Sequence, residues 1–400
     1  MDSIIKTNGI KGANGVSTNG VNGINGNSHK PLRIAQVAPL YERVPPRLYG
    51  GTERVVSHIT EELVRRGHEV TLFASGDSQT SAKLVPGCPQ ALRLSGRPHM
   101  GTFLQLPMLS DVYERASSFD VIHTHLDYWS FPLARLTPTP SVATMHGRLD
   151  IPELKPVYAR YRSLPLISIS DSQRAPLPFM NWVTTVYHGV PRNRLEYSPG
   201  PGKYLAFLGR ISPEKRPDIA IEVAKRAGVP LKIAAKVDNV DKEYFANVIK
   251  PLLTSGVELI GEIGDDQKSE FLGNALALMF PIDWPEPFGM VMIEAMACGT
   301  PIITRPCGSV PEVVMPGVSG FIGDTVEELV AAVKKVDTLS RAACRKEFET
   351  RFTVEVMVDQ YEHVYRQLIE ERQSKTIDSP INRAIAACEV QAFTGQSDAG

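Results

Sequence analysis

The chain has 400 residues, of which 42% are hydrophobic and 22% charged, and its 43 Lys and Arg nearly balance its 44 Asp and Glu. This length exceeds what one hydrophobic core usually serves, so two domains are expected. The charge balance and the lack of a basic stripe exclude a nucleic-acid platform. No run of 18 apolar residues occurs. We therefore expect no transmembrane segment, and the sequence leaves contact with a membrane surface open.

The two ends of the chain lack a periodic pattern. Residues 1–30 repeat Asn-Gly and have no apolar stretch of the kind that targeting signals carry, which predicts a flexible leader. Residues 374–400 are expected to form a loose tail. The five cysteines are scattered and include no C-x-x-C pair, a pattern typical of free thiols in a reducing compartment. We expect a cytoplasmic protein.

Between these ends, short apolar runs alternate with amphipathic stretches, which predicts an α/β fold with parallel sheets. Residues 31–190 form the expected first domain, with a helix over 52–66 and an irregular span over 86–101. Its strands are expected at 34–38, 70–74, 121–124, 141–145, 166–169 and 184–187. Residues 191–203 break the periodicity and are the expected linker.

A second α/β series over 204–352 forms the expected second domain. Its strands are expected at 204–208, 231–234, 257–259, 275–281, 302–303 and 320–322, and its helices at 213–227, 242–253, 290–297 and 327–336. A terminal helix over 353–373 is expected to pack back towards the first domain. Two doubly wound domains of this kind place a ligand cleft at the carboxyl ends of their strands.

The most informative segment lies between Glu286 and Glu294. An apolar strand, a Pro-Phe-Gly turn and a short helix follow one another, and a carboxylate stands on each side of the turn. The free N–H groups of a helix start suit a phosphate, and ionised carboxylates suit hydroxyl groups. The segment therefore predicts a ligand that has both phosphates and hydroxyls.

Two further loops at strand ends carry suitable chemistry. Arg210 and Lys215 follow the first strand of the second domain around a Pro-initiated helix start, where two cations can hold a diphosphate. In the first domain, Gly50 and Gly51 let the backbone approach a ligand, and Thr52 is the expected helix cap. No G-x-G-x-x-G follows the first strand, which argues against a nicotinamide-type site.

Histidines at strand ends complete the candidate residues. His146 ends the strand at 141–145. His123 and His125, with Asp127 nearby, could suggest a metal site. Two strand residues and one acid are a weak pattern for metal binding, so no metal is predicted.

These motifs together resemble retaining glycosyltransferases of the GT-B fold, family 4, over roughly residues 32 to 372. The resemblance is carried by Glu286-Pro-Phe-Gly with Glu294, the run to Ile303, Gly308 to Val314, and the loop with Arg210 and Lys215. It implies two Rossmann-like domains that face each other across a cleft, an acceptor-side domain first and a donor-binding domain second. Arg216 stands where many members have Gly, and Gly147 stands where Asp often follows the histidine.

The resemblance also implies roles for single residues. Glu286, Arg210, Lys215 and His146 would be catalytic: Glu286 and His146 beside the donor sugar, the two cations against its phosphates. The donor would contact Gly50, Gly51, Gly261, Phe288, Gly289, Met290, Val291 and Glu294, with Glu294 at the ribose.

The implied reaction transfers a sugar from a nucleoside-diphosphate sugar to an acceptor hydroxyl with retention of anomeric configuration. It needs no cofactor and no metal, in agreement with the absence of a D-x-D motif. The acceptor is left open as a carbohydrate, a lipid-linked molecule or a small molecule. A sugar-nucleotide epimerase, a phosphorylase and a non-catalytic nucleotide-sugar binding protein on the same fold are the alternatives.

Overall fold

A computed structural model of the chain describes residues 30–48 and 50–377. The expected leader over 1–30, apart from Lys30, and the expected tail from 378 on lie outside these residues. From Leu32 on, the described residues form one compact unit. In the described part of the chain no helix is long and apolar enough to cross a bilayer.

Seven parallel strands form the first sheet, in the order β3-β2-β1-β4-β5-β6-β7. They are β1 (Arg33–Val37), β2 (Glu69–Ser75), β3 (Lys83–Cys88), β4 (Val121–Thr124), β5 (Ser141–Thr144), β6 (Leu166–Ser168) and β7 (Trp182–Thr185). The order runs outward from β1 in both directions, so the sheet is doubly wound. The crevice for a ligand therefore lies beyond the carboxyl ends of β1 and β4.

Helices connect these strands, as parallel pairs require. They are α1 (Gly51–Arg65), α2 (Gly101–Glu114), α3 (Phe131–Ala134), α4 (Lys155–Arg160) and α5 (Asp171–Arg174). In α1, Val55, Ile59 and Leu63 recur at helical spacing and pack with Ile34 of β1 in one buried cluster. This packing holds the start of α1 at the carboxyl ends of the strands, where the crevice for a ligand lies.

Six parallel strands form the second sheet, in the order β10-β9-β8-β11-β12-β13. They are β8 (Tyr204–Arg210), β9 (Leu231–Lys236), β10 (Val257–Gly261), β11 (Ala275–Phe280), β12 (Ile302–Thr304) and β13 (Gly320–Ile322). Their helices are α6 (Pro217–Ala227), α7 (Lys242–Tyr244), α8 (Asp265–Gly273), α9 (Met290–Ala297), α10 (Val310–Val313), α11 (Val326–Lys335) and α12 (Arg341–Arg351). The order again runs outward from a central pair, β8 and β11, so two doubly wound α/β sheets are present, as predicted.

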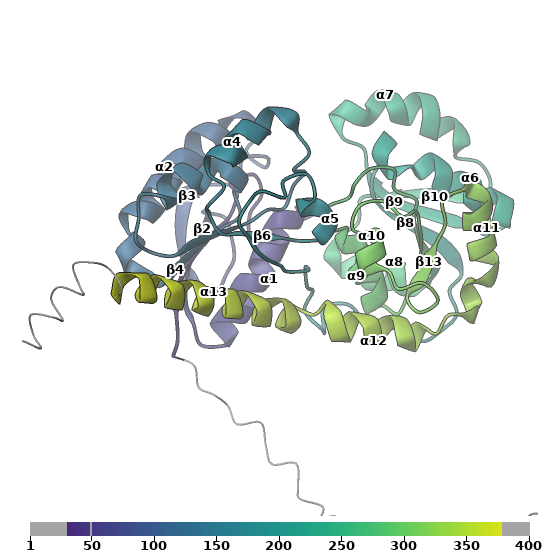
Figure 1. Cartoon of the computed structure of the whole chain (residues 1–400). Coiled ribbons are helices and arrows are strands. Elements are labelled where there is room, and N and C mark those ends of the chain that lie inside the picture. The colour runs from purple at the N-terminus through teal and green to yellow at the C-terminus, as the bar shows by residue number, and fades with distance from the viewer. Residues whose placement is uncertain (1–29, 49, 378–400) are drawn as a thin grey trace, which may run out of the picture. The chain divides into compact units, whose positions relative to one another are not determined.

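The last helix, α13 (Val354–Ile377), returns to the first sheet. Met357, Tyr361 and Tyr365 of α13 are buried in the same cluster as Leu32 and Ile34. Figure 1 shows α13, in yellow, running alongside α1. Because α13 continues to Ile377, the first four residues of the expected tail are helical rather than loose.

The irregular span expected over 86–101 is wrong at both ends. Strand β3 continues to Cys88, and Gly101 is the first residue of α2. β3 is an edge strand, and an edge tolerates Pro86, which has no N–H to donate to a neighbouring strand.

Two expected helices of the second series are interrupted. The helix expected over 213–227 is a 3₁₀ turn over Pro213–Lys215 followed by α6, because Pro217 disfavours the helical conformation at Arg216, which takes φ 53°. The helix expected over 242–253 divides into α7, a π-helical turn at Phe245–Ile249 and a 3₁₀ turn at Lys250–Leu252.

Candidate functional site

A cavity of about 670 Å³ lies at the carboxyl ends of strands from both sheets. Its size suits a nucleotide or sugar ligand. The predicted residues that line it are Gly51, His146, Arg210, Lys215, Glu286, Phe288, Gly289, Met290 and Val291. A smaller cavity of about 190 Å³ shares Gly51, Met290 and Val291 with it and adds Gly50 and Glu294. Gly261 lines neither cavity, although its neighbour Glu262 lines the smaller one.

The turn before α9 is held by its own backbone. Gly289 is the residue before the helix and has φ 78°, a conformation that glycine adopts without strain. No side chain caps α9, so its first N–H groups remain available at the cavity edge. Behind the turn, Ser309 Oγ donates to the Phe288 carbonyl at 2.8 Å. The N-terminus of α9 therefore presents a positive dipole end to the cavity.

Lys215 and Glu286, predicted to hold different parts of a ligand, form an ion pair with each other. Trp284 Nε1 donates to the same carboxylate oxygen of Glu286 at 2.8 Å. The Lys215 ammonium also lies 5.4 Å from the centroid of a Trp284 ring. The three side chains form one charge-balanced group at the wall of the cavity.

Arg210, at the end of β8, is surrounded by carboxylates. It forms an ion pair with Glu214, and its Nε lies 3.4 Å from a carboxylate oxygen of Asp241. Asp238 lies 3.9 Å from another of its nitrogens. Both predicted phosphate-binding cations therefore carry carboxylate partners.

Glu294, a residue of α9, belongs to a second group of charged side chains. It is 6% exposed and accepts a hydrogen bond from Lys268 Nζ at 2.6 Å. Lys268 also lies 3.1 Å from Asp265, which pairs with Arg54 of α1 and with Arg194. Burial alone would raise the pKa of Asp265, but these three cations lower it to about 2. The cluster ties the second sheet's helices to α1.

The expected cap at Thr52 is wrong. Helix α1 starts one residue earlier, at Gly51, so Gly50 is the N-cap and no side chain caps the helix. Gly50 has φ 146°, and a Cβ at this position would lie 2.8 Å from Pro46 Cβ. The chain therefore needs glycine here to bring the start of α1 to the cavity.

His146 is held by a chain of hydrogen bonds that leads away from the cavity. Its Nε2 lies 2.8 Å from His125 Nδ1, and His125 Nε2 lies 2.9 Å from Gln36 Oε1. Gln36 Nε2 donates to the Tyr365 hydroxyl at 3.0 Å. With Oε1 of Gln36 facing His125, the proton of His125 is on Nε2. Its Nδ1 then accepts from His146 Nε2, which leaves His146 Nδ1 as an acceptor.

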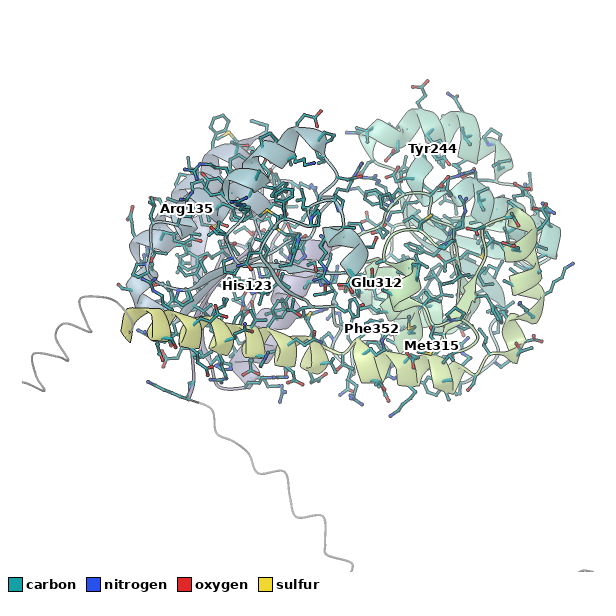
Figure 2. The ribbon with its side chains drawn as sticks, in the orientation of Figure 1. His123, Arg135, Tyr244, Glu312, Met315 and Phe352 are labelled. Atoms are coloured by element: carbon teal, nitrogen blue, oxygen red, sulfur yellow. The ribbon has the colours of Figure 1, made fainter. Side chains whose placement is uncertain are left out.

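The same network continues through α13. The Tyr365 hydroxyl lies 2.7 Å from His123 Nδ1, and His123 Nε2 lies 2.7 Å from Thr144 Oγ1. Figure 2 shows His123 on the first sheet, next to α13. Burial lowers the pKa of both His123 and His146 to about 3. These imidazoles are therefore neutral at pH 7, and α13 supports the position of His146.

His188 packs on His146. The two rings are stacked with centroids 5.2 Å apart, and His188 meets Phe288 edge-on at 4.9 Å. Its Nδ1 is buried without a hydrogen-bond partner. Within residues 30–48 and 50–377, no group of three His, Cys, Asp or Glu side chains could hold a metal ion, and His123 and His125 are used by the network instead.

The sequence motifs missed two residues of the site, Trp284 and Lys268. Trp284 stands two residues before Glu286, so proximity to the motif was a usable signal. His125 was considered only as a metal ligand. Lys268 reaches Glu294 from α8, a pairing that no local pattern indicates.

Two family models match the chain. One, described as "Glycosyl transferases group 1", matches residues 195–350, and the other, described as "Glycosyltransferase Family 4", matches residues 49–199. Among curated proteins, the chain is 25% identical over 382 residues to a D-inositol 3-phosphate glycosyltransferase of Mycolicibacterium smegmatis, covering 78% of this chain and 86% of that protein. It is 26% identical over 360 residues to a glycogen synthase of Mycobacterium tuberculosis, covering 76% and 86%.

Solved structures share the architecture. A sucrose-phosphate synthase from Thermosynechococcus elongatus aligns with a TM-score of 0.69 at 19% identity, covering 85% of this chain and all of that one. Anabaena Alr3699/HepE, solved in complex with UDP and glucose, aligns with a TM-score of 0.65 at 18% identity, covering 84% and 100%. With the two parallel sheets, these likenesses confirm the predicted two-domain GT-B fold.

Proposed function

The chain belongs to the family 4, or group 1, glycosyltransferases, and we propose that it transfers a sugar from a nucleoside-diphosphate sugar to an acceptor hydroxyl. The transfer retains the anomeric configuration and uses no metal. The observation that carries the proposal is one cavity in which Arg210, Lys215, Glu286 and the uncapped N-terminus of α9 converge.

The donor's diphosphate is the part that this arrangement fits best. The first N–H groups of α9 and the Lys215 ammonium supply positive potential without a redox or metal centre. A diphosphate brought to Lys215 competes with Glu286 for the ammonium, so Glu286 is released towards the sugar. In this way one ion pair can serve both phosphate and sugar. The HepE neighbour, described with UDP and glucose, supports a donor of this class.

The nucleoside is proposed to occupy the smaller cavity. Glu294 lies there beside Lys268, and its carboxylate can accept hydrogen bonds from the two ribose hydroxyls. Lys268 donates to one oxygen of this buried carboxylate, which leaves acceptor capacity for ligand hydroxyl groups. We propose that Gly261 and its neighbour Glu262 lie beside the nucleotide base.

The reaction demands a stabilised leaving group and a sugar that carries positive charge in the transition state. Lys215, Arg210 and α9 stabilise the departing phosphate, and Glu286 faces the sugar. A phosphate oxygen takes the proton of the acceptor hydroxyl on the same face, so no side-chain base is needed. His146, neutral and with Nδ1 as an acceptor, orients a sugar hydroxyl rather than donating a proton.

The alternative functions, an epimerase and a non-catalytic binding protein, predict different products. An epimerase on this fold would release nucleoside diphosphate only as a side product, and a non-catalytic binding protein would release none. The names of the relatives include a D-inositol 3-phosphate glycosyltransferase and a glycogen synthase, so membership of the family does not identify the acceptor.

We also propose a cytoplasmic location. The proposal rests on the four described cysteines, which are free thiols.

The test is release of nucleoside diphosphate from UDP-, ADP- and GDP-sugars, with and without sugar acceptors. We expect one donor class to be consumed, with retained configuration in the product by NMR and with full activity in EDTA. Lys215→Ala should lower turnover at least tenfold. Lys232→Ala is the matched control, since Lys232 forms a Lys–Glu pair with Glu258 at 3.2 Å but lines neither cavity. Near-normal transfer by Lys215→Ala would contradict the proposed role of Lys215 and the function that rests on it.

A further inference from the structure

The first-sheet side of the larger cavity carries polar groups that the donor chemistry leaves unused. They are Tyr41, Glu53, Arg93, Gln105, Asp127 and Trp129. Glu53 comes from the first turn of α1, Gln105 from α2, and Asp127 and Trp129 from the turn after β4. These elements meet opposite the Lys215–Glu286 pair in the same cavity, so a second molecule held here would adjoin the donor sugar.

Gln105 is the residue of this wall that most clearly indicates a hydrogen bond to a ligand. The residue is 2% exposed and lines the cavity, and within residues 30–48 and 50–377 its buried Oε1 has no hydrogen-bond partner. A buried amide oxygen without a donor costs about 1–3 kcal/mol. A ligand hydroxyl placed beside it would remove that cost.

The same wall also carries two carboxyl groups, those of Glu53 and Asp127, whose surroundings raise their pKa. Glu53 is 5% exposed, and burial raises its pKa to about 7. Burial raises the pKa of Asp127 to about 6, against the effect of the His146 backbone N–H that it accepts. A ligand that donates hydroxyl hydrogen bonds stabilises both carboxylates, whereas a second anion would destabilise them.

The cations on this wall are already paired with carboxylates. Arg93 lies 3.3 Å from Glu42 and over the Tyr41 ring at 5.9 Å. Arg148, the other cation on the first-sheet side, donates two hydrogen bonds to Asp150, at 2.8 and 2.9 Å. A phosphate group placed here would compete with these carboxylates for the guanidinium groups and would lie beside the carboxyl groups of Glu53 and Asp127.

An aromatic surface completes the wall. The Trp129 ring lines the cavity and stacks on Tyr128 with ring centroids 5.5 Å apart. A rigid aromatic face beside carboxylates and an amide fits a ring that is apolar on its faces and hydroxylated at its edge.

We infer that this wall binds an uncharged, hydroxyl-rich acceptor, a sugar or cyclic polyol, through Gln105, Glu53, Asp127 and Trp129, and discriminates against its phosphorylated forms. The inference rests on the proposed glycosyl transfer. It adds the chemical class of the acceptor and the residues that select it.

The experiment uses the full chain and the donor identified by nucleoside diphosphate release. Glucose, maltose and myo-inositol are each compared with their monophosphates. We expect transfer to at least one neutral compound, with kcat/KM at least tenfold above that of its phosphate. Transfer to none of the neutral compounds, or better transfer to a phosphate, overturns the inference. Release of nucleoside diphosphate is measured in parallel with and without each compound, and its absence under all of these conditions contradicts the proposed function instead.

Variants separate this wall from the donor site. Gln105→Leu and Glu53→Gln should each raise the acceptor KM at least fivefold, while the donor KM and acceptor-independent hydrolysis stay within twofold of the native values. Gln367→Leu, a change at an exposed glutamine of α13, is the control and should alter neither constant. An unchanged acceptor KM in both cavity variants contradicts the assignment. Equal rises in donor and acceptor KM also contradict it, because they indicate a structural role.

Discussion

Lys215 and Glu286 are in contact, although their expected ligands are a phosphate and a sugar. An ammonium and a carboxylate that touch cancel much of each other's field at the cavity wall. Trp284 fixes the carboxylate by donating to the oxygen that also meets Lys215. The pair therefore makes binding of a diphosphate weaker than an unpaired lysine would, and binding must separate the two charges.

This coupling predicts opposite effects of two substitutions. Glu286→Gln removes the competing negative charge, so the affinity for free nucleoside diphosphate should rise about two- to tenfold while turnover falls at least tenfold. Lys215→Ala should lower both affinity and turnover. Isothermal calorimetry with the free nucleoside diphosphate and a steady-state assay give the two readouts. Weaker nucleotide binding in Glu286→Gln would contradict the competition.

The histidine network predicts a defined tautomer at the cavity. At pH 7, His146 should be neutral and protonated on Nε2, because His125 Nδ1 accepts its proton. Nitrogen-15 NMR of histidine-labelled protein measures this directly. His125→Phe removes the acceptor and should yield a mixture of His146 tautomers. Tyr361→Phe removes only a hydroxyl that lies 3.2 Å from Thr144 Oγ1, outside the Gln36–His125–His146 chain, and should leave the His146 tautomer unchanged as a control.

At the scale of elements, the loop that carries Glu286 is positioned by a second loop, the one after β12. Gly308 has φ 62°, and a Cβ at this position would lie 2.3 Å from the Glu286 nitrogen and 2.4 Å from its carbonyl oxygen. Ser309 N donates to the Glu286 carbonyl at 3.0 Å. Backbone packs on backbone here, so a flexible side chain cannot relieve the crowding.

Gly308→Ala should therefore displace Glu286 and reduce turnover at least tenfold, besides destabilising the fold. Gly228→Ala is the matched control, because Gly228 has φ 70° but its added Cβ would meet no atom within 4 Å. The control carries only the cost of the left-handed conformation, about 1–2 kcal/mol. Turnover and urea unfolding of both variants test the difference. Equal turnover in the two variants would contradict the positioning role.

The alternation of strands and helices could be predicted from the sequence because buried parallel strands are continuous apolar runs. Ala275–Phe280, for example, is buried almost throughout, and the helix at Met290–Ala297 was expected with these bounds. The edge strand β3 and helix α12 were missed. β3 contains Pro86 and Gly87, and α12 is highly charged with only Cys344 and Phe348 buried. Neither pattern is periodic enough to indicate an element.

The candidate site could be predicted only where its residues belong to one local motif. Glu286, Phe288 and Gly289 lie at one turn, and all line the cavity. The partners of these residues could not be predicted, because they come from distant elements. Lys268 contacts Glu294 from α8, and Gln36 of β1 contacts His125, which follows the neighbouring strand β4. Such pairs depend on the three-dimensional packing of sheets and helices, which no local spacing encodes.

At the scale of the whole molecule, few polar contacts join the elements of the two sheets. Glu312 of α10, labelled in Figure 2, accepts hydrogen bonds from the backbone N–H groups of Asp171 and Ser172 at the start of α5, both at 2.7 Å. Arg54 of α1 pairs with Asp265 of α8. These contacts join elements of the two sheets, so a movement that separates those elements must break charged contacts.

Buried histidines gather on the first-sheet side of the cavity and make stability depend on pH. Burial lowers the pKa of His58, His123 and His146 to about 3 and lowers the pKa of His125 and His188 well below the usual value. An unfolded chain protonates these five side chains near pH 6.5, whereas burial keeps them neutral to a lower pH in the folded chain, to about pH 3 for His58, His123 and His146. The unfolded state therefore binds more protons below pH 6.5, and the free energy of unfolding falls as the pH falls.

Carboxyl groups with a raised pKa, Glu53, Asp127 and Asp241, act in the opposite direction. Because the pKa of Glu53 is raised to about 7 and that of Asp127 to about 6, the folded state holds their protons at pH values where the unfolded state has lost them. Five histidines outnumber the carboxyl groups with a raised pKa, so the unfolded state holds an excess of protons near pH 5, and each excess proton lowers the free energy of unfolding by about 1.4 kcal/mol for each unit that the pH falls. Urea unfolding at pH 7.5, 6.5, 5.5 and 5.0 should show this loss. His58→Asn should reduce the slope, and replacing the exposed His99 with Gln should not, because only the buried imidazole loses water on folding. A free energy of unfolding that is equal at pH 7.5 and 5.0 would contradict the neutral histidine network.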